Sequence, residues 1–138
     1  MAKDSNKYNY TIRDFKDNEP QVIAEILHDI YLSHFVPGNS PKDYYCGIAT
    51  DVNTRFSYHE NNDWEIAKIL AVIDCGDPQG EKPSNAARVE KFMGDREDDP
   101  NHTHKYYGLD IGKKAGNGEG DHTRYVYLVK KGKMISIC

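Results

Sequence analysis

The spacing of hydrophobic residues predicts a helix early in the chain. Hydrophobic side chains recur at helical intervals over residues 22–31, and Phe35 continues the same stripe. Pro20 suits the first turn of a helix, whereas Pro37-Gly38 is a typical stop. The pattern therefore predicts a helix over about residues 20–34.

Other stretches alternate between apolar and polar residues, or are continuously apolar, and these predict strands. They are residues 8–15, 44–46, about 65–74 and 124–130. Lys131-Gly132 suits a tight turn, and residues 134–138 are again mostly apolar. The chain is therefore expected to end in a β-hairpin. Residues 105–111 could form a short strand or an ordered loop.

Two further helices are predicted after residues that can cap a helix. Thr50 and Asp51 carry short side-chain oxygens, which accept hydrogen bonds from the first backbone N–H groups of a helix. That helix is expected to end at a loop over residues 60–63. Ser84-Asn85 can cap a second helix running to about Asp95. The fold class predicted is α+β, with a small, mainly antiparallel sheet flanked by helices.

Length and charge limit the possible architectures and partners. A chain of 138 residues is expected to form one domain, and its formal net charge of −4 gives no overall attraction to nucleic acid. The charge is uneven, because residues 101–138 contain 7 Lys and Arg against 3 Asp and Glu. This basic quarter could form a local phosphate-contacting face, or it could be a solvated surface.

The cysteines and the apolar runs indicate the compartment. The 3 cysteines are widely spaced, and the sequence contains no C-x-x-C motif. A disulfide framework is therefore not expected, which favours a reducing compartment. The N-terminus has no apolar signal-like segment, and no apolar run approaches the length that spans a membrane. The expectation is a cytoplasmic protein that does not contact a membrane.

The stretch that carries candidate chemistry is residues 44–59, YYCGIATDVNTRFSYH. A strand here ends in Tyr45-Cys46-Gly47, and the following helix carries Arg55 and His59. Because these two residues are four apart, they project from the same helix face. A phenol, a guanidinium and an imidazole in one cleft are the groups needed to hold a phosphate and move a proton.

This stretch resembles the second half of the GIY-YIG nuclease module. In that family a strand ending in Tyr-x-Gly precedes a helix that presents an Arg and, four residues later, a His or Tyr; Tyr45, Arg55 and His59 stand at these positions. The resemblance covers roughly residues 29–117. It implies a three-stranded, mainly antiparallel sheet flanked by helices, to which the C-terminal hairpin would be an addition.

The first motif of that family, Gly-Ile-Tyr, has only a degraded match in this chain. The nearest match is Asp29-Ile30-Tyr31, which lacks the glycine and falls within the predicted helix. The strand over residues 8–15 could instead pair with the Tyr-x-Gly strand. The first tyrosine of the site is therefore expected to be Tyr31, with Tyr8 or Tyr10 as alternatives.

The resemblance also assigns residues further along the chain. The segment over residues 86–92 looks like the family helix whose glutamate binds a divalent metal ion, which makes Glu90 the expected ligand of Mg²⁺ or Mn²⁺. The alternative is a surface glutamate paired with Lys91 or Arg88. The late asparagine of the family is matched by Asn117, in a Gly-rich loop that could also be a flexible turn.

Basic residues near this asparagine are the expected contacts to nucleic acid. They are Lys113, Lys114 and Arg124. The two lysines lie beside a glycine-rich loop, which could wrap a phosphate.

The function implied by the resemblance is a metal-dependent endonuclease that hydrolyses phosphodiester bonds in DNA, and cutting both strands of a duplex would need a homodimer or two separate events. Tyr45 or Tyr31 would take a proton from the attacking water, and Arg55 would neutralise charge on the phosphate. His59 would orient groups or accept a proton, while Glu90 would hold the metal ion. Asn117 would fix the geometry of the site.

A second function remains open at this point, because the first motif is degraded and the chain is acidic. The chain could be a non-catalytic protein that keeps a degenerate GIY-YIG-like fold. Such a protein would bind nucleic acid, or inhibit a nuclease.

Overall fold

The computed structural model describes residues 8–77, 83–94, 110–111 and 123–135. The helices in these ranges are α1 (Pro20–His34), α2 (Val52–Asn62) and α3 (Asn85–Gly94), with a short 3-10 turn, η2 (Pro41–Asp43). The strands are β1 (Ile12–Asp14), β2 (Tyr44–Ala49), β3 (Trp64–Asp74), β4 (Asp110–Ile111) and β5 (Tyr125–Met134). The α+β class expected from the sequence is confirmed.

The strands form one mixed sheet in the order β1-β3-β5-β2-β4. The central strand, β5, runs antiparallel to both β3 and β2. Each outer strand is parallel to its neighbour, β1 to β3 and β4 to β2. In the β2–β5 register Gly47 stands directly opposite Tyr127. This pairing places the middle of the Tyr-x-Gly strand against the centre of the sheet.

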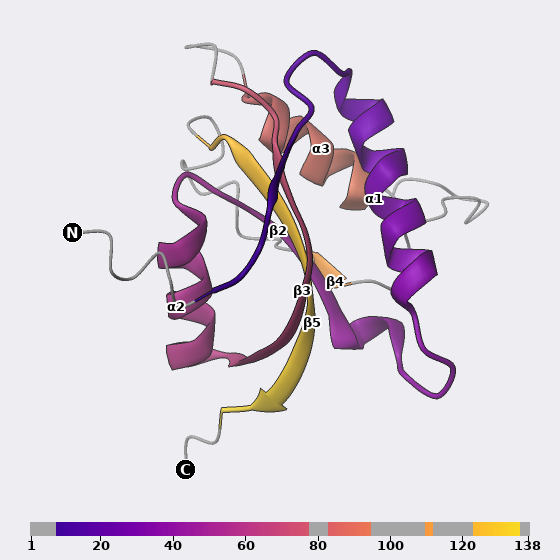
Figure 1. Cartoon of the computed structure of the whole chain (residues 1–138), viewed down its shortest axis with the longest axis vertical. Helices are drawn as coiled ribbons and strands as arrows, with labels where there is room; N and C mark the ends of the chain where they lie inside the picture. The colour runs from indigo at the N-terminus through magenta and orange to yellow at the C-terminus, as the bar shows by residue number, and fades with distance from the viewer. Residues whose placement is uncertain (1–7, 78–82, 95–109, 112–122, 136–138) are drawn as a thin grey trace.

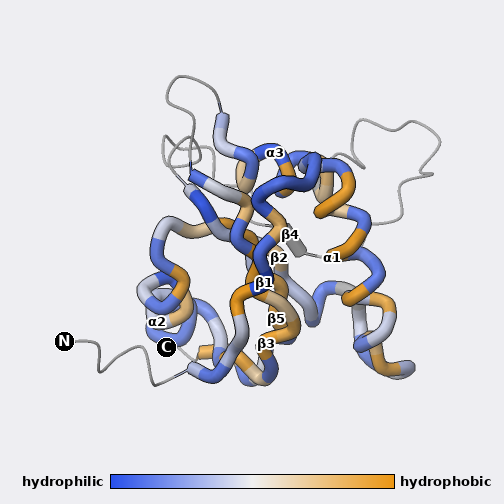
Figure 2. Tube along the Cα trace, turned by 45° about the horizontal axis from the view of Figure 1, so that its top comes forward, coloured by the Kyte–Doolittle hydropathy of each residue, from blue (hydrophilic) through white to orange (hydrophobic). Residues whose placement is uncertain are grey.

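The helices cover both faces of the sheet. Figure 1 shows α2 on one side and α1 with α3 on the other. Successive side chains of a strand point to opposite faces, so Cys46 and Ile48 join the core under α1 and α3, whereas Tyr45 and Ala49 pack under α2. Hydrophobic residues follow the central strands and recur at intervals along the helices, as Figure 2 shows. The sheet is therefore buried between two separate hydrophobic cores.

Local signals in the sequence set the helix starts. Helix α1 begins at Pro20 and ends at His34, as predicted. The Asp51 side chain accepts a hydrogen bond from the backbone N–H of Thr54 at 3.2 Å, and Ser84 Oγ accepts one from Ala87 N at 3.0 Å. Both predicted caps are confirmed, and each satisfies a backbone donor that the helix itself leaves without a partner.

Two predictions about the strands and loops are wrong. Helix α2 continues to Asn62, so residues 60–62 are not a loop. Strand β5 runs through Lys131-Gly132 without turning, because β3 pairs with it along this length and Met134 lies opposite Trp64. The predicted terminal hairpin is therefore absent from the described part of the chain, and residues 136–138 lie outside it.

The sheet also differs from the three-stranded one that the resemblance implied. In the described ranges it has five strands. The partners of β2 are β5 and β4, and not the strand predicted over residues 8–15. That strand is shortened to Ile12–Asp14 and lies parallel to β3 at the far edge of the sheet.

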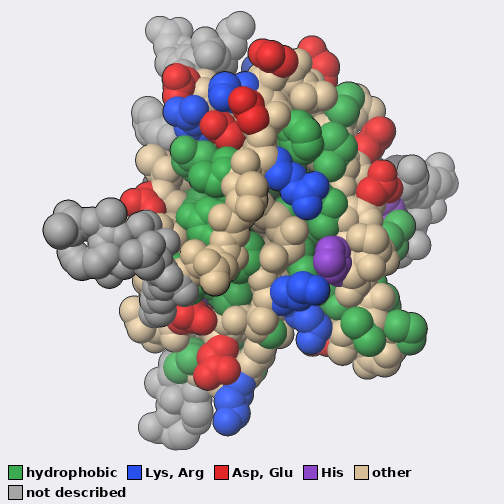
Figure 3. Space-filling model, viewed as in Figure 1, with side chains coloured by type: hydrophobic (Ala, Val, Ile, Leu, Met, Phe, Trp, Pro, Cys, Tyr) green, Lys and Arg blue, Asp and Glu red, His purple; other side chains and the backbone are tan. Residues whose placement is uncertain are grey.

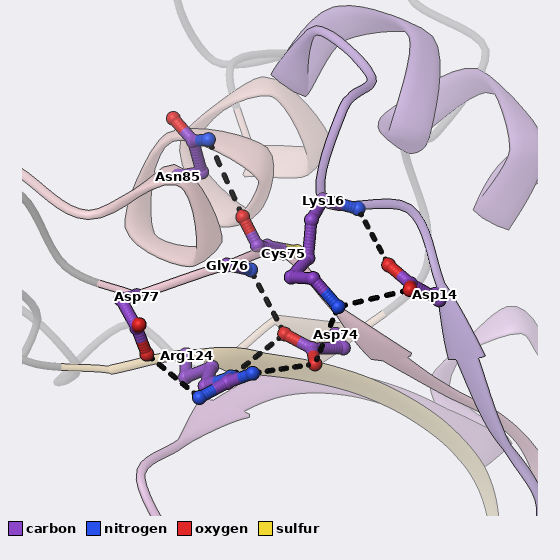
Figure 4. Close-up of polar contacts among 8 residues, drawn as sticks. All are labelled: Asp14, Lys16, Asp74, Cys75, Gly76, Asp77, Asn85 and Arg124. Atoms are coloured by element: carbon purple, nitrogen blue, oxygen red, sulfur yellow. Dashed lines mark hydrogen bonds and ion pairs between the residues drawn. The ribbon is translucent and has the colours of Figure 1, made fainter.

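Arg124 joins the end of β3 to the start of β5 (Figure 4). Its Nε and Nη2 donate to the two carboxylate oxygens of Asp74 at 2.8 and 2.9 Å, and its Nη1 donates to Asp77 at 2.6 Å. Asp74 is buried, and its Oδ1 also accepts the backbone N–H of Gly76 at 2.9 Å. The hydrogen bonds from Arg124 are the main cause of the lowered pKa of Asp74. The guanidinium predicted to contact nucleic acid is thus held by two carboxylates.

Replacing Arg124 tests this structural role. We expect Arg124→Gln to lower the thermal unfolding midpoint by several degrees, because the buried Asp74 carboxylate loses its bidentate partner. The pairing lowers the pKa of Asp74. The stability that the Asp74–Arg124 ion pair contributes is therefore present above about pH 3.9 and is lost as the pH falls further. The difference between the two proteins should therefore shrink in acid. Asp77→Asn is the control, since that side chain is 76% exposed, and it should change the midpoint little.

Candidate functional site

The candidate site is built around a glycine in the middle of β2. A Cβ atom placed on Gly47 would lie 2.6 Å from Tyr127 Oη and 2.8 Å from ring atom Cε2 of Tyr45. Both distances are too short for any side chain other than hydrogen. Only glycine here lets two tyrosine rings cover the same point of the strand on the α2 face.

His59 of α2 completes this group from the helix side. Its Nε2 lies 2.7 Å from Tyr127 Oη, and its Nδ1 lies 2.8 Å from Asp63 Oδ2. The indole of Trp64 stacks on the imidazole at a centroid distance of 4.4 Å, and the Tyr45 ring meets it at 5.0 Å with 71° between the ring planes. The imidazole is buried and fixed by hydrogen bonds at both nitrogens and by aromatic rings around it.

The hydrogen bonds of His59 determine where its proton lies. Burial lowers the pKa of His59, and the hydrogen bond to Asp63 only partly opposes this effect. The imidazole is therefore neutral at pH 7. Because the Asp63 carboxylate can only accept, Nδ1 carries the proton and Nε2 accepts from the Tyr127 hydroxyl. Burial also holds the pKa of Tyr127 well above its usual value, so the phenol is protonated.

Arg55 and Glu90 lie on helices that cover opposite faces of the sheet. Arg55 lies on α2 and is half-buried, while Glu90 lies on α3 and is 8% exposed. Arg55 acts to lower the pKa values of both Glu90 and Tyr127, and the Glu90 charge acts on Tyr127 as well. Electrostatic interactions therefore link Arg55 of α2 with Glu90 of α3 and with Tyr127 of β5.

The carboxyl of Glu90 is buried without full hydrogen bonding. Among the described residues, its Oε2 has no hydrogen-bond partner. Burial raises the pKa of Glu90 to about 8, with Arg55 opposing the shift. A buried polar oxygen without a partner costs free energy unless another group binds it. A cation bound at this oxygen would relieve that cost and displace the proton.

A hard divalent ion fits this carboxyl. Mg²⁺ keeps most of its waters and needs only one or two protein carboxylates in addition to a substrate phosphate. The described ranges contain no group of three or more His, Cys, Asp and Glu side chains suited to a metal ion. In the described structure, the predicted metal residue Glu90 is a buried carboxyl with one oxygen that lacks a hydrogen-bond partner.

Of the residues predicted from the sequence, Tyr45 and His59 are in contact, and Arg55 interacts electrostatically with His59. Glu90 lies on α3 at the other face of the sheet and interacts with Arg55 only electrostatically. Tyr31 also lies on that other face, on α1, where its ring packs edge-on against Tyr44 at 5.2 Å. The hydroxyls of Tyr8 and Tyr10 donate to Glu60 and Asn53 on α2. Asn117, Lys113 and Lys114 lie outside the described residues.

Tyr127 and Asp63 were not predicted as site residues. The alternation of β5 places Tyr127 on the same face as Tyr125 and Val129, but only the register with β2 brings it over Gly47. Asp63 lies four residues after His59, and this spacing is the signal that could have identified it. The second phenol beside Tyr45 therefore comes from the C-terminal strand and not from α1.

Comparison of the chain with protein-family models, curated proteins and solved structures finds no match. Among the described residues, no helix has the length and apolar character needed to cross a membrane. The function is accordingly inferred from the side chains gathered around Gly47.

A methyl group at Gly47 should disrupt this arrangement. We expect Gly47→Ala to cost about 1–3 kcal/mol of stability, because the new Cβ overlaps the Tyr127 hydroxyl and the Tyr45 ring. Urea unfolding measures the loss. Gly132→Ala in β5 is the matched control, since its Cβ would meet its nearest neighbour at 3.3 Å. Equal losses in the two variants would contradict the tight contact at Gly47.

The buried carboxyl of Glu90 predicts an unusual pH dependence of stability. The folded protein keeps this proton up to about pH 8, whereas an unfolded glutamate releases it near about pH 4.3. The contribution of Glu90 to stability therefore falls as pH rises between these values. Glu90→Gln should become more stable relative to the unaltered protein by about 1–3 kcal/mol between pH 5 and pH 9, in metal-free buffer with EDTA. A pH-independent difference in urea unfolding would contradict the raised pKa.

Proposed function

We propose that this protein is a metal-dependent endonuclease that hydrolyses phosphodiester bonds in DNA. The observation that carries the proposal is the buried Glu90 carboxyl, whose Oε2 lacks a hydrogen-bond partner and whose charge interacts with Arg55 and Tyr127. A metal-binding carboxyl, a guanidinium and protonatable rings are the groups that phosphoryl chemistry requires.

Each group has a role in this proposal. Glu90 is the ligand of Mg²⁺ or Mn²⁺, and a bound ion supplies positive charge for the leaving oxygen and the phosphate. Arg55 places a guanidinium beside the same phosphate, where its fork of N–H donors stabilises the extra negative charge of the transition state. Tyr45 and His59 lie on the same face of the sheet as Arg55 and handle the proton of the attacking water.

Charge on the described surface supports a local contact with DNA. Figure 3 shows Lys and Arg side chains in separate groups among acidic and hydrophobic ones. At one end of the sheet, however, Lys130 of β5 stands opposite Lys68 of β3, and Lys131 lies 5.6 Å from the ring of Trp64, next to His59. These lysines give a basic end to the strand that carries Tyr127. One such site cuts one strand, so cleavage of a duplex requires a homodimer or two separate events.

A plasmid-nicking assay tests the proposal. The unaltered protein should convert supercoiled plasmid to open circles with Mg²⁺ or Mn²⁺ and should lose this activity in EDTA. Glu90→Gln keeps the shape of the side chain but removes its charge, and should reduce the rate at least about 100-fold. Glu25→Gln changes an exposed glutamate of α1 and is the matched control, with an unchanged rate.

A metal-binding readout separates catalysis from binding. Mg²⁺ should raise the thermal midpoint of the unaltered protein and of Glu25→Gln, but not of Glu90→Gln. Cleavage that is equally strong in Glu90→Gln would contradict the proposal. DNA binding that weakens with salt, without any cleavage, would identify the chain as a non-catalytic binding protein instead.

A further inference from the structure

A row of aromatic rings flanked by two cations lies where the second half of α2 meets the start of β3 and the end of β5. Arg55 lies over the Tyr58 ring, with its Cζ 5.6 Å from the ring centroid, and the Tyr58 and His59 rings meet at 6.1 Å. His59 stacks on Trp64 at 4.4 Å, and Lys131 Nζ lies 5.6 Å from the centroid of the Trp64 ring. A continuous series of contacts thus joins a cation of the helix to a cation of the sheet.

Tyr58 gives this row an exposed aromatic ring. It is 52% exposed, whereas His59 and Trp64 beside it are 4% and 5% exposed. Arg55 is half-buried, and its guanidinium restrains the Tyr58 ring through a cation–π contact. A ring that is already held in place loses little freedom when a flat ligand stacks on it.

An irregularity in the pairing of β3 and β5 adds a second exposed side chain. Trp64 lies opposite Met134 and Ile66 lies opposite Lys131, so β5 has one residue more than β3 between these two pairs. Residues that oppose each other in a sheet share a face, and Trp64 and Ile66 both belong to the core under α2. Lys131 and Met134 therefore both lie on the α2 face, where Met134 is 67% exposed. Bulges of this kind re-aim side chains and are frequent beside functional sites.

Three acidic residues are close in sequence to this surface. Glu60 accepts hydrogen bonds at both carboxylate oxygens, and Asp63 Oδ2 lies 2.8 Å from His59 Nδ1. Glu65 stands between two residues of the α2 face, and the alternation of β3 directs its side chain to the other face. The charges of Glu60 and Asp63 are thus partly met by donors within the protein, and Glu65 is directed away.

We propose that this surface binds single-stranded nucleic acid, with a base stacked on Tyr58 and a backbone phosphate at Lys131. Every base has a flat face that can stack on an aromatic ring, and proteins that bind single strands combine such rings with cations that contact the backbone. Met134 offers an apolar contact to a neighbouring base. DNA and RNA share the bases and phosphates that these side chains recognise.

A duplex fits this surface poorly. Its bases are already stacked on one another, so it presents mainly backbone phosphates and the edges of its bases. Two cations are too few to hold a duplex by charge alone, and the formal net charge of −4 opposes the approach of any polyanion. Stacking must therefore supply much of the affinity, and it requires unpaired bases.

This binding does not depend on the proposed cleavage. Glu90 lies on α3 at the other face of the sheet, so the surface is separate from the proposed metal carboxyl. It can therefore be tested in EDTA, where no metal-dependent reaction takes place.

Fluorescence anisotropy with labelled oligothymidylate and oligouridylate of about 12 nucleotides tests the role of Tyr58. The unaltered protein should bind at least one of them about 10-fold more tightly than a duplex of the same length, and the tighter strand distinguishes DNA from RNA. Tyr58→Ala should weaken this binding about 10-fold, whereas Tyr58→Phe keeps the ring and should bind normally. Leu32→Ala, at an exposed hydrophobic residue of α1, is the control and should bind normally.

Tryptophan fluorescence shows where the strand binds. The chain contains 1 tryptophan, Trp64, so its emission reports on this surface alone. The emission should change on binding, because a phosphate draws the Lys131 ammonium away from the indole ring.

Salt dependence tests the phosphate contact at Lys131. Lys131→Gln should reduce the slope of log affinity against log salt concentration by about 0.7, the value for one phosphate of a single strand. Lys91→Gln, at an exposed lysine of α3, is the control and should leave the slope unchanged.

The outcomes separate this surface from the proposed endonuclease. Absence of single-strand binding, equal affinity for the duplex, normal binding by Tyr58→Ala or an unchanged Trp64 emission would each overturn the surface. Nicking of plasmid without single-strand binding would leave the endonuclease in place. Single-strand binding at this surface without nicking would support the surface and overturn the endonuclease alone.

Discussion

The hydrogen bond between Tyr127 and His59 is the interaction on which the arrangement of this protein depends. It joins residues that lie 68 positions apart and links the central strand of the sheet to α2. Both groups are buried, so each would cost free energy without the other. The bond forms only because Gly47 leaves room for the phenol between β2 and the helix. The absence of a side chain at Gly47 thus allows α2 and the sheet to pack together around the Tyr127 hydroxyl.

Glu90 shows the opposite situation on the other side of the sheet. Its carboxyl is buried among hydrophobic residues of α3, yet one oxygen has no partner in the described structure. A core built for stability alone would use a hydrophobic residue there or satisfy the carboxyl. Violations of this kind concentrate at functional sites. The unpartnered oxygen of Glu90 is thus the observation from which a cationic ligand is proposed at this carboxyl.

Much of the fold and part of the candidate site could be predicted from local patterns in the sequence. Helix α1 followed from its hydrophobic stripe and Pro20, and the starts of α2 and α3 followed from their caps. The spacing of Tyr45, Arg55 and His59 placed these residues on adjoining elements, and that needed only a strand, a turn and a helix.

Features that depend on contacts between distant segments could not be predicted in this way. Lys131-Gly132 has the composition of a turn, but pairing with the long strand β3 keeps β5 extended through it. Tyr31 has the right sequence neighbours, but the inward face of α1 points into the opposite core. Tyr127 enters the site only through the register between β2 and β5, which no short pattern encodes.

The most direct test of the central claim is to locate a bound metal ion. Mn²⁺ added in small amounts to ¹⁵N-labelled protein broadens the signals of nearby amides. We expect broadening around Glu90 in α3 and around Gly47 in β2, and we expect Glu90→Gln to abolish it. Broadening confined to other acidic residues, or unchanged by Glu90→Gln, would contradict a metal site at this carboxyl.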